Sequence, residues 1–148
     1  MIKIEDIIEQ FEIQNEEMCS FYNKKTGELY TVFEEDLLSA EEGEEIGAYS
    51  GEPLEKERDI LQNDNWIQLP TQFDIHEWEI MEKFCYTIED VALQDELLDA
   101  IHGSGAFRIF KSTIRRKGIE EKWYSFRYQA FKEMAIEWCE ENGIEWEE

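Results

Sequence analysis

The residues best suited to chemistry in this sequence are cations and aromatic rings that gather in one segment, residues 103–132. Eight Lys or Arg and only two acids, Glu120 and Glu121, give this segment a charge of +6, whereas the whole chain carries −23. Seven Phe, Trp or Tyr are interleaved with the bases. Guanidinium and ammonium groups bind carboxylates and phosphates, and exposed rings add stacking and cation–π contacts. The segment is therefore a candidate binding surface.

The bases fall on two predicted helices that Gly118 separates. Arg108, Lys111 and Arg115 recur at i, i+3 and i+7, which places them on one stripe of the first helix. The alternative to a surface that faces a partner is internal pairing with the 37 Asp and Glu of the chain. The candidate interaction surface comprises Arg108, Lys111, Arg115, Arg116, Lys117, Lys122, Tyr124, Arg127 and Tyr128.

No catalytic motif accompanies this surface. Ser104 lacks the G-x-S-x-G context of a nucleophilic serine, and its flanking glycines belong to no phosphate-binding loop motif. The helix start after Gly105 offers backbone N–H groups to an anion, although a sharp corner between helices is the simpler interpretation. His76 and His102 lack clustered Cys or acids at ligand spacing. We predict no active site, no cofactor and no metal centre, and we favour a non-enzymatic function.

Cysteine usage and the N-terminus indicate the compartment. Cys19, Cys85 and Cys139 are odd in number and contain no C-x-x-C pair, so we expect three buried thiols, without disulfides or zinc. The first residues, MIKIEDIIEQF, are acidic where a signal peptide requires a basic start. No stretch approaches the ~20 apolar residues of a membrane span. We therefore predict a cytoplasmic protein that does not bind membranes.

The elements that position the surface begin with a helix at residues 3–13, whose apolar residues recur at helical spacing. Two aromatic and β-branched runs, 18–23 and 28–33, flank NKKTG and predict a hairpin. Residues 66–69 predict a third strand at a sheet edge, because the following proline cannot extend a ladder. Between them we expect an acidic helix from Glu34, a flexible acidic connection at about 41–57, and a helix from Pro53 to about Asn63 with apolar contacts Leu54, Ile60 and Leu61.

The second half of the chain is predicted to be helical. Asp74 with Glu77, and Thr87 with Asp90, have the spacing of helix capping boxes. Gly103 ends the second of these helices, and the helix from Gly105 to Gly118 is expected to bury Phe107, Phe110 and Ile114. The longest helix spans about 120–141. Together these features predict one α+β domain, 1–148: an antiparallel sheet of about three strands, formed by the hairpin 18–33 and strand 66–69, packed with a C-terminal cluster of about four helices.

Several motifs in order give the chain a resemblance to a known family. They are YNKKTGELYTV in the hairpin, WIQLP, MEKF, then GSGAFRIFK, WYSFR and EWCEENGI. The sequence resembles the bacterial proteins of uncharacterised protein family 0158 over most of its length. The resemblance implies no catalytic or ligand-binding residues, because no function defines that family.

The charge distribution and the missing catalytic motifs favour a protein-interaction module. The partner is expected to be another protein, bound through the acidic N-terminal half or through residues 103–132. The alternative is recognition of nucleic acid or a nucleotide-like anion by 103–132, although the net charge of −23 disfavours general affinity for polyanions.

Overall fold

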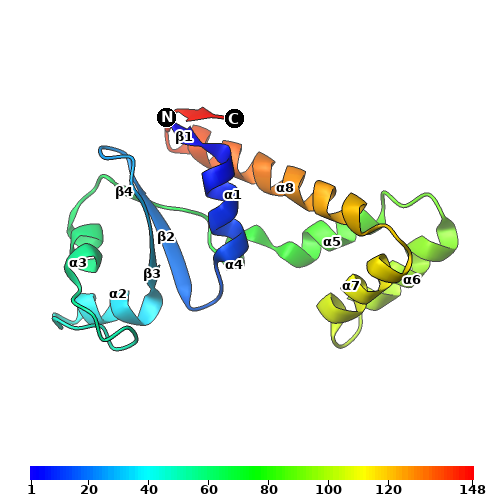
Figure 1. The fold of residues 1–148 in the computed structure, drawn as a ribbon, viewed down its shortest axis with the longest axis horizontal. Helices are drawn as coiled ribbons and strands as arrows, with labels where there is room; N and C mark the ends of the chain where they lie inside the picture. Colours follow the sequence, from blue (N-terminus) through cyan, green and yellow to red (C-terminus); the bar gives the residue numbers. More distant parts are fainter. The chain divides into compact units, whose positions relative to one another are not determined.

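The computed structural model describes all residues, Met1–Glu148. The chain divides into two compact units: unit 1 is Met1–Ile75 with Met134–Glu148, and unit 2 is His76–Glu133. The predicted α+β class is confirmed, with a three-stranded antiparallel sheet in unit 1 and helices throughout unit 2 (Figure 1). The single-domain assignment of residues 1–148 stays a prediction.

The sheet of unit 1 has the order β3-β2-β4. β2 (Met18–Asn23) and β3 (Leu29–Phe33) form the predicted hairpin, and β4 (Trp66–Gln68) pairs antiparallel with β2 at the predicted edge position. The turn forms because the Asn23 side chain accepts hydrogen bonds from the backbone N–H groups of Lys25 and Thr26, at 2.9 and 3.0 Å. Gly27 then adopts φ +78°, a conformation that favours glycine.

Strand alternation sends the two faces of β2 to different neighbours. Cys19 and Phe21 join a buried cluster that also contains Val32, Ile60 and Trp66. In this cluster Ile60 belongs to α3 (Glu55–Gln62), and Leu37 of α2 (Glu34–Glu41) packs against it.

On the opposite face, the Ser20 hydroxyl donates to Gln10 of α1 (Ile4–Ile13) at 3.0 Å. Tyr22 makes an edge contact with Trp138, which lies in the last turns of α8 (Glu120–Glu141). Trp138 also donates its indole N–H to the backbone oxygen of Gln68 at 2.9 Å. The end of α8 is thereby fixed to the sheet within unit 1.

The chain ends form a second, parallel strand pair that the sequence analysis did not predict. β1 (Ile2–Lys3) pairs with β5 (Trp146–Glu147), so that Ile2 lies opposite Trp146. Two-residue strands carry too little alternation to be recognised from sequence.

The acidic connection is anchored by one buried carboxylate. Asp36 is 2% exposed and accepts hydrogen bonds from the backbone N–H groups of Tyr49 and Ser50, at 3.0 and 3.1 Å. Within the connection, Gly47 donates its N–H to Glu52, and a bridge joins Ile46 to Pro53. The structure thus gives part of residues 41–57 a defined hydrogen-bond pattern, and their flexibility stays a prediction.

Unit 2 contains α5 (Glu77–Cys85), α6 (Val91–Ile101), α7 (Ala106–Arg116) and the first part of α8. Its core is aromatic: Phe84, Phe110 and Trp123 contact one another edge-on, with ring centroids 4.9–6.1 Å apart. Aromatic pairs prefer such edge-to-face geometry because the ring edge is positive and the face negative.

The predicted caps need correction. Asp74 does not cap α5. Its carboxylate accepts hydrogen bonds from the backbone N–H and the hydroxyl of Thr71, at 2.9 and 3.0 Å, at the start of the short helix α4 (Gln72–Ile75). The capping pair is therefore Thr71 with Asp74, three residues earlier than predicted. α5 follows a left-handed residue, His76, with φ 53°.

The second predicted cap is displaced by three residues in the opposite direction, toward the C-terminus. Asp90, and not Thr87, caps α6 by accepting the N–H of Leu93 at 3.1 Å. Thr87 instead donates its hydroxyl to the backbone oxygen of Phe84 at 2.6 Å. Two predicted core residues are also wrong, because Leu61 is 40% and Phe107 46% exposed.

Candidate functional site

The structure divides the eight bases of residues 103–132 into two groups. Arg115 pairs with Glu120 at 3.2 Å, Arg116 with Glu96 at 2.9 Å, and Arg127 with Glu77 at 2.6 Å. Lys132 also has an interaction partner. For the three arginines the internal-pairing alternative is correct.

The other four bases have no such partner. Arg108, Lys111, Lys117 and Lys122 are exposed, and none of them forms an ion pair. Of the two tyrosines in the predicted surface, Tyr124 is 47% and Tyr128 37% exposed. They lie one helical turn apart on α8. The predicted nine-residue surface is thus a mixture of free and neutralised side chains.

Two of the paired arginines have further interactions around them. The hydrogen bond from Arg116 lowers the pKa of the Glu96 carboxyl, and the charges of Arg116 and Lys117 lower it further. Arg127 is less exposed than the other arginines and also lies over the ring of Phe131, 4.5 Å from its centroid. Its position between a carboxylate and a ring is that of a structural residue.

Charge differs strongly between the two units. Unit 2 holds nine of the 14 Lys and Arg but only eleven of the 37 Asp and Glu, a net charge of −2, and unit 1 carries the remaining −21. The free cations therefore lie in the nearly neutral unit, where acids slightly outnumber bases and yet form no ion pair with these four.

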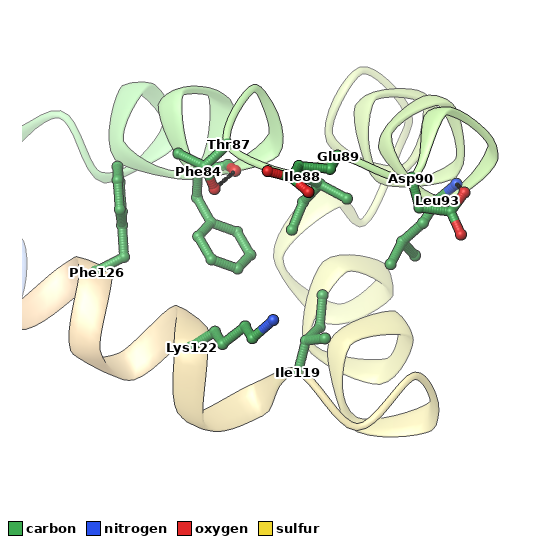
Figure 2. Close-up of a pocket in the computed structure, with 9 residues that line it drawn as sticks. All are labelled: Phe84, Thr87, Ile88, Glu89, Asp90, Leu93, Ile119, Lys122 and Phe126. Atoms are coloured by element: carbon green, nitrogen blue, oxygen red, sulfur yellow. Dashed lines mark hydrogen bonds between the residues drawn. The ribbon is translucent and has the colours of Figure 1, made fainter.

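A groove of about 530 Å³ lies beside one of the free cations (Figure 2). It is bounded by the α5–α6 connection, the start of α6, and the start of α8. Its apolar lining consists of Phe84, Ile88, Leu93, Ile119 and Phe126. Figure 2 shows side chains of this lining directed into the hollow, and the Lys122 ammonium extending into it from α8.

Some polar groups of the opposite wall already form hydrogen bonds within the protein. Asp90 is the α6 cap, and the Thr87 hydroxyl is bound to a backbone carbonyl. Glu89 is exposed and adds one negative charge to this wall. An occupant with an apolar side chain and a nearby anionic group would fill the hollow and pair with Lys122. No nucleophile–base pair lines the groove, and no group of His, Cys, Asp and Glu is placed to hold a metal ion.

Sequence reasoning did not identify this groove. Leu93, in the first turn of α6, is half-buried and lines the hollow. Ile88 and Ile119 lie just before helices, outside the periodic apolar stripes. The sequence signal for the groove was the presence of apolar residues at these non-periodic positions, next to Gly118 and next to a capping motif.

Comparison with known proteins identifies the family. A family model described as Uncharacterised protein family (UPF0158) matches residues 1–147. The chain belongs to UPF0158. The predicted resemblance is thereby confirmed over nearly the whole sequence. No curated protein and no solved structure matches the chain.

Membership of UPF0158 assigns no role to any residue, so a functional conclusion depends on the geometry. None of the helices in this UPF0158 protein combines the length and the apolar character that a membrane crossing requires.

Proposed function

We propose that this UPF0158 protein is a non-enzymatic protein-interaction module, and that unit 2 binds an acidic segment of another protein. The observation that carries the proposal is the set of four exposed, unpaired bases, Arg108, Lys111, Lys117 and Lys122, in a chain with 37 carboxylates. Carboxylates of a partner are the groups that these bases are suited to bind.

The groove adds an apolar component to this charge. A surface ion pair alone contributes only about 0.2–1 kcal/mol. Burying an apolar side chain contributes about 1.5–3 kcal/mol, because its surface leaves water. An acidic segment with one aromatic or branched side chain would use both: the side chain in the groove, and a carboxylate on Lys122.

A protein segment is favoured over nucleic acid by the charge of the whole chain. At −23, the molecule repels a long polyanion, whereas a short segment with a few carboxylates experiences much less repulsion. The exposed Tyr124 and Tyr128 are the features that support the nucleic-acid alternative, because tyrosine rings stack on bases. That alternative is one outcome of the experiment below.

We also propose a cytoplasmic location, supported by the cysteines. Cys19, Cys85 and Cys139 are free and buried. Chains that function in oxidising compartments more often join such residues in disulfides.

The experiment selects peptides of about 12 residues, long enough for three helical turns, from a display library with the full-length chain as bait. Selected peptides are then measured against two double variants with equal charge change. K117Q/K122Q removes two free bases, and R115Q/R116Q removes two paired ones. We expect enriched peptides that combine an aromatic or branched residue with Asp or Glu. Their affinity should fall about tenfold in K117Q/K122Q, a loss of ~1.4 kcal/mol, and change little in R115Q/R116Q.

Three results would contradict the proposal. The first is enrichment of peptides without acids. The second is an equal loss in both double variants, which would indicate only the change in total charge. The third is tight binding of a mixed-sequence single-stranded RNA at about 50 mM salt that weakens steeply with added salt, which would assign the surface to nucleic acid.

A further inference from the structure

A second apolar groove, of about 430 Å³, lies in unit 1 between α2 and the β2–β4 part of the sheet. Phe21, Leu37 and Leu38 provide its apolar lining, and Leu38 is 53% exposed. An exposed leucine beside a hollow offers a partner apolar surface that remains in water in the free protein. This groove shares no residue with the groove of unit 2.

The rim of this groove has one sign of charge. The charged residues that line it are Glu34, Glu35 and Glu41, all exposed, and none forms an ion pair. An apolar hollow with a rim of three free carboxylates is complementary to an apolar side chain flanked by cations.

The cations of unit 1 cannot neutralise that rim. Unit 1 contains five Lys or Arg against 26 Asp or Glu. Three of the five are held elsewhere: Lys56 pairs with Glu28 at 2.8 Å, Lys24 donates to the Asn142 carbonyl at 2.9 Å, and Arg58 donates to the Glu44 carbonyl at 3.3 Å. The remaining two, Lys3 and Lys25, form no ion pair with the rim either, so its carboxylates are open to the cations of another molecule.

We infer that the groove beside α2 docks a basic amphipathic segment of a partner protein. Its apolar side chains pack on Leu38 and Leu37, and its Lys or Arg side chains pair with Glu34 and Glu41. The charge of −21 on unit 1 steers such a segment toward this unit before contact. The inference is independent of the proposed function of unit 2, because it concerns other residues and a partner of opposite charge.

The probe is an amphipathic peptide of about 12 residues made of Leu and Lys, with Leu at helical i, i+3, i+4 spacing. Its reference is the same peptide with every Lys replaced by Glu. Binding to the full-length chain is measured by fluorescence anisotropy at about 50 mM salt and at about 0.5 M salt, where surface charge attraction is largely screened.

Two pairs of variants separate docking from general attraction to an acidic protein. Leu38→Ser is compared with Leu61→Ser, since Leu61 is an exposed leucine on another short helix of unit 1 and lies outside the groove. E34Q/E41Q is compared with E52Q/E55Q, which changes the net charge equally at exposed positions away from the groove.

We expect the Leu/Lys peptide to bind and the Leu/Glu peptide not to bind. Leu38→Ser and E34Q/E41Q should each weaken binding about tenfold, whereas their controls stay within about twofold of the parent, and 0.5 M salt should weaken every complex. Circular dichroism of each variant verifies that it is folded.

Three results overturn the inference. One is no binding of the Leu/Lys peptide at low salt. Another is equal weakening in groove and control variants, which shows attraction to net charge alone. The last is self-association of the chain, observed by sedimentation and abolished by Leu38→Ser. That result assigns the groove to a second copy of the chain. Because K117Q/K122Q leaves this groove unchanged, failure here leaves the proposal for unit 2 intact, and the reverse also holds.

Discussion

At the scale of single residues, Asp36 has a disproportionate role in unit 1. Burial alone raises the pKa of its carboxyl, but hydrogen bonds from the Ser50 side chain and from the backbone N–H groups of Ser50 and Tyr49 outweigh burial, so the pKa lies below its usual value. The ionised carboxylate is thus the form that holds the 46–53 connection against α2.

Replacing Asp36 by Ala should lower the free energy of unfolding by about 2–3 kcal/mol, because the N–H groups it binds lose their acceptor. Asp64→Ala, at an exposed turn position, is the control and should change stability by less than about 0.5 kcal/mol. Urea titration followed by circular dichroism measures both. Equal stability of Asp36→Ala and the parent would show that the connection does not depend on this carboxylate.

The contribution of Asp36 to the free energy of unfolding should decrease as the pH falls. A folded-state pKa below the unfolded value means that the carboxylate contributes stability fully above the unfolded pKa. That contribution is lost as pH falls through the lower, folded pKa. The stability difference between the parent and Asp36→Asn should therefore be constant near pH 7 and shrink below about pH 4. A difference that instead grows on acidification contradicts the assignment.

The three cysteines should be unreactive in the folded chain. Burial raises the pKa of the Cys19, Cys85 and Cys139 thiols to about 11 each. Because the thiolate is the nucleophile, alkylation by iodoacetamide at about pH 8 should be slow, and all three should react rapidly in denaturant. Mass spectrometry after timed labelling counts the modified thiols. Rapid labelling of one cysteine in the native chain would show that its site opens readily.

At the scale of elements, the sequence predicted most of the fold and little of the site. The hairpin was predictable because alternation and the NKKTG turn agree, and α8 because its apolar face extends over many turns. The predicted caps, Asp74 and Thr87, were misplaced because a Thr and an Asp that are both suitable caps lie three residues apart in each motif. The backbone conformation of the folded protein decides which of the two residues caps the helix.

The groove of unit 2 and the separation of free from paired bases could not be predicted for a similar reason. Arg116 and Lys117 are adjacent in sequence and equally basic, yet only Arg116 reaches a carboxylate, Glu96 on α6. That outcome depends on how α6 and α7 pack, which periodicity does not determine. Burial of Phe110 and exposure of Phe107, both predicted on one stripe, depend on the same packing.

A substitution at Gly47 tests the packing of α2 against the acidic connection, and the same substitution at Gly103 is the control. A Cβ at Gly47 would collide with the Asp36 carboxylate, whereas a Cβ at Gly103 would meet nothing closer than 3.8 Å, and neither glycine has a positive φ. Gly47→Ala should therefore cost about 1–3 kcal/mol of stability through overpacking, and Gly103→Ala should be neutral or slightly stabilising. Thermal unfolding compares the two. Equal melting temperatures would show that the connection moves away from α2 without cost.

At the scale of the whole molecule, the charge of −23 makes salt a stabilising agent. Unit 1, with −21, carries nearly all of the self-repulsion, and unit 2, with −2, carries little. Raising salt from about 10 to about 150 mM shortens the screening length from ~30 to ~8 Å. Distant carboxylates then repel one another less. We expect the melting temperature to rise by about 3–4 °C, which corresponds to ~1 kcal/mol for a chain of this size.

The stabilisation by added salt should differ between the two units. Amide hydrogen exchange should show a larger gain in protection for unit 1 than for unit 2, because only unit 1 has a large excess of like charges to screen. At about pH 4, where many carboxyls are protonated, the salt effect should shrink. An equal gain in both units, or a fall in melting temperature with salt, would indicate that ion pairs such as Arg127–Glu77, which salt weakens, contribute more to stability than the repulsion does.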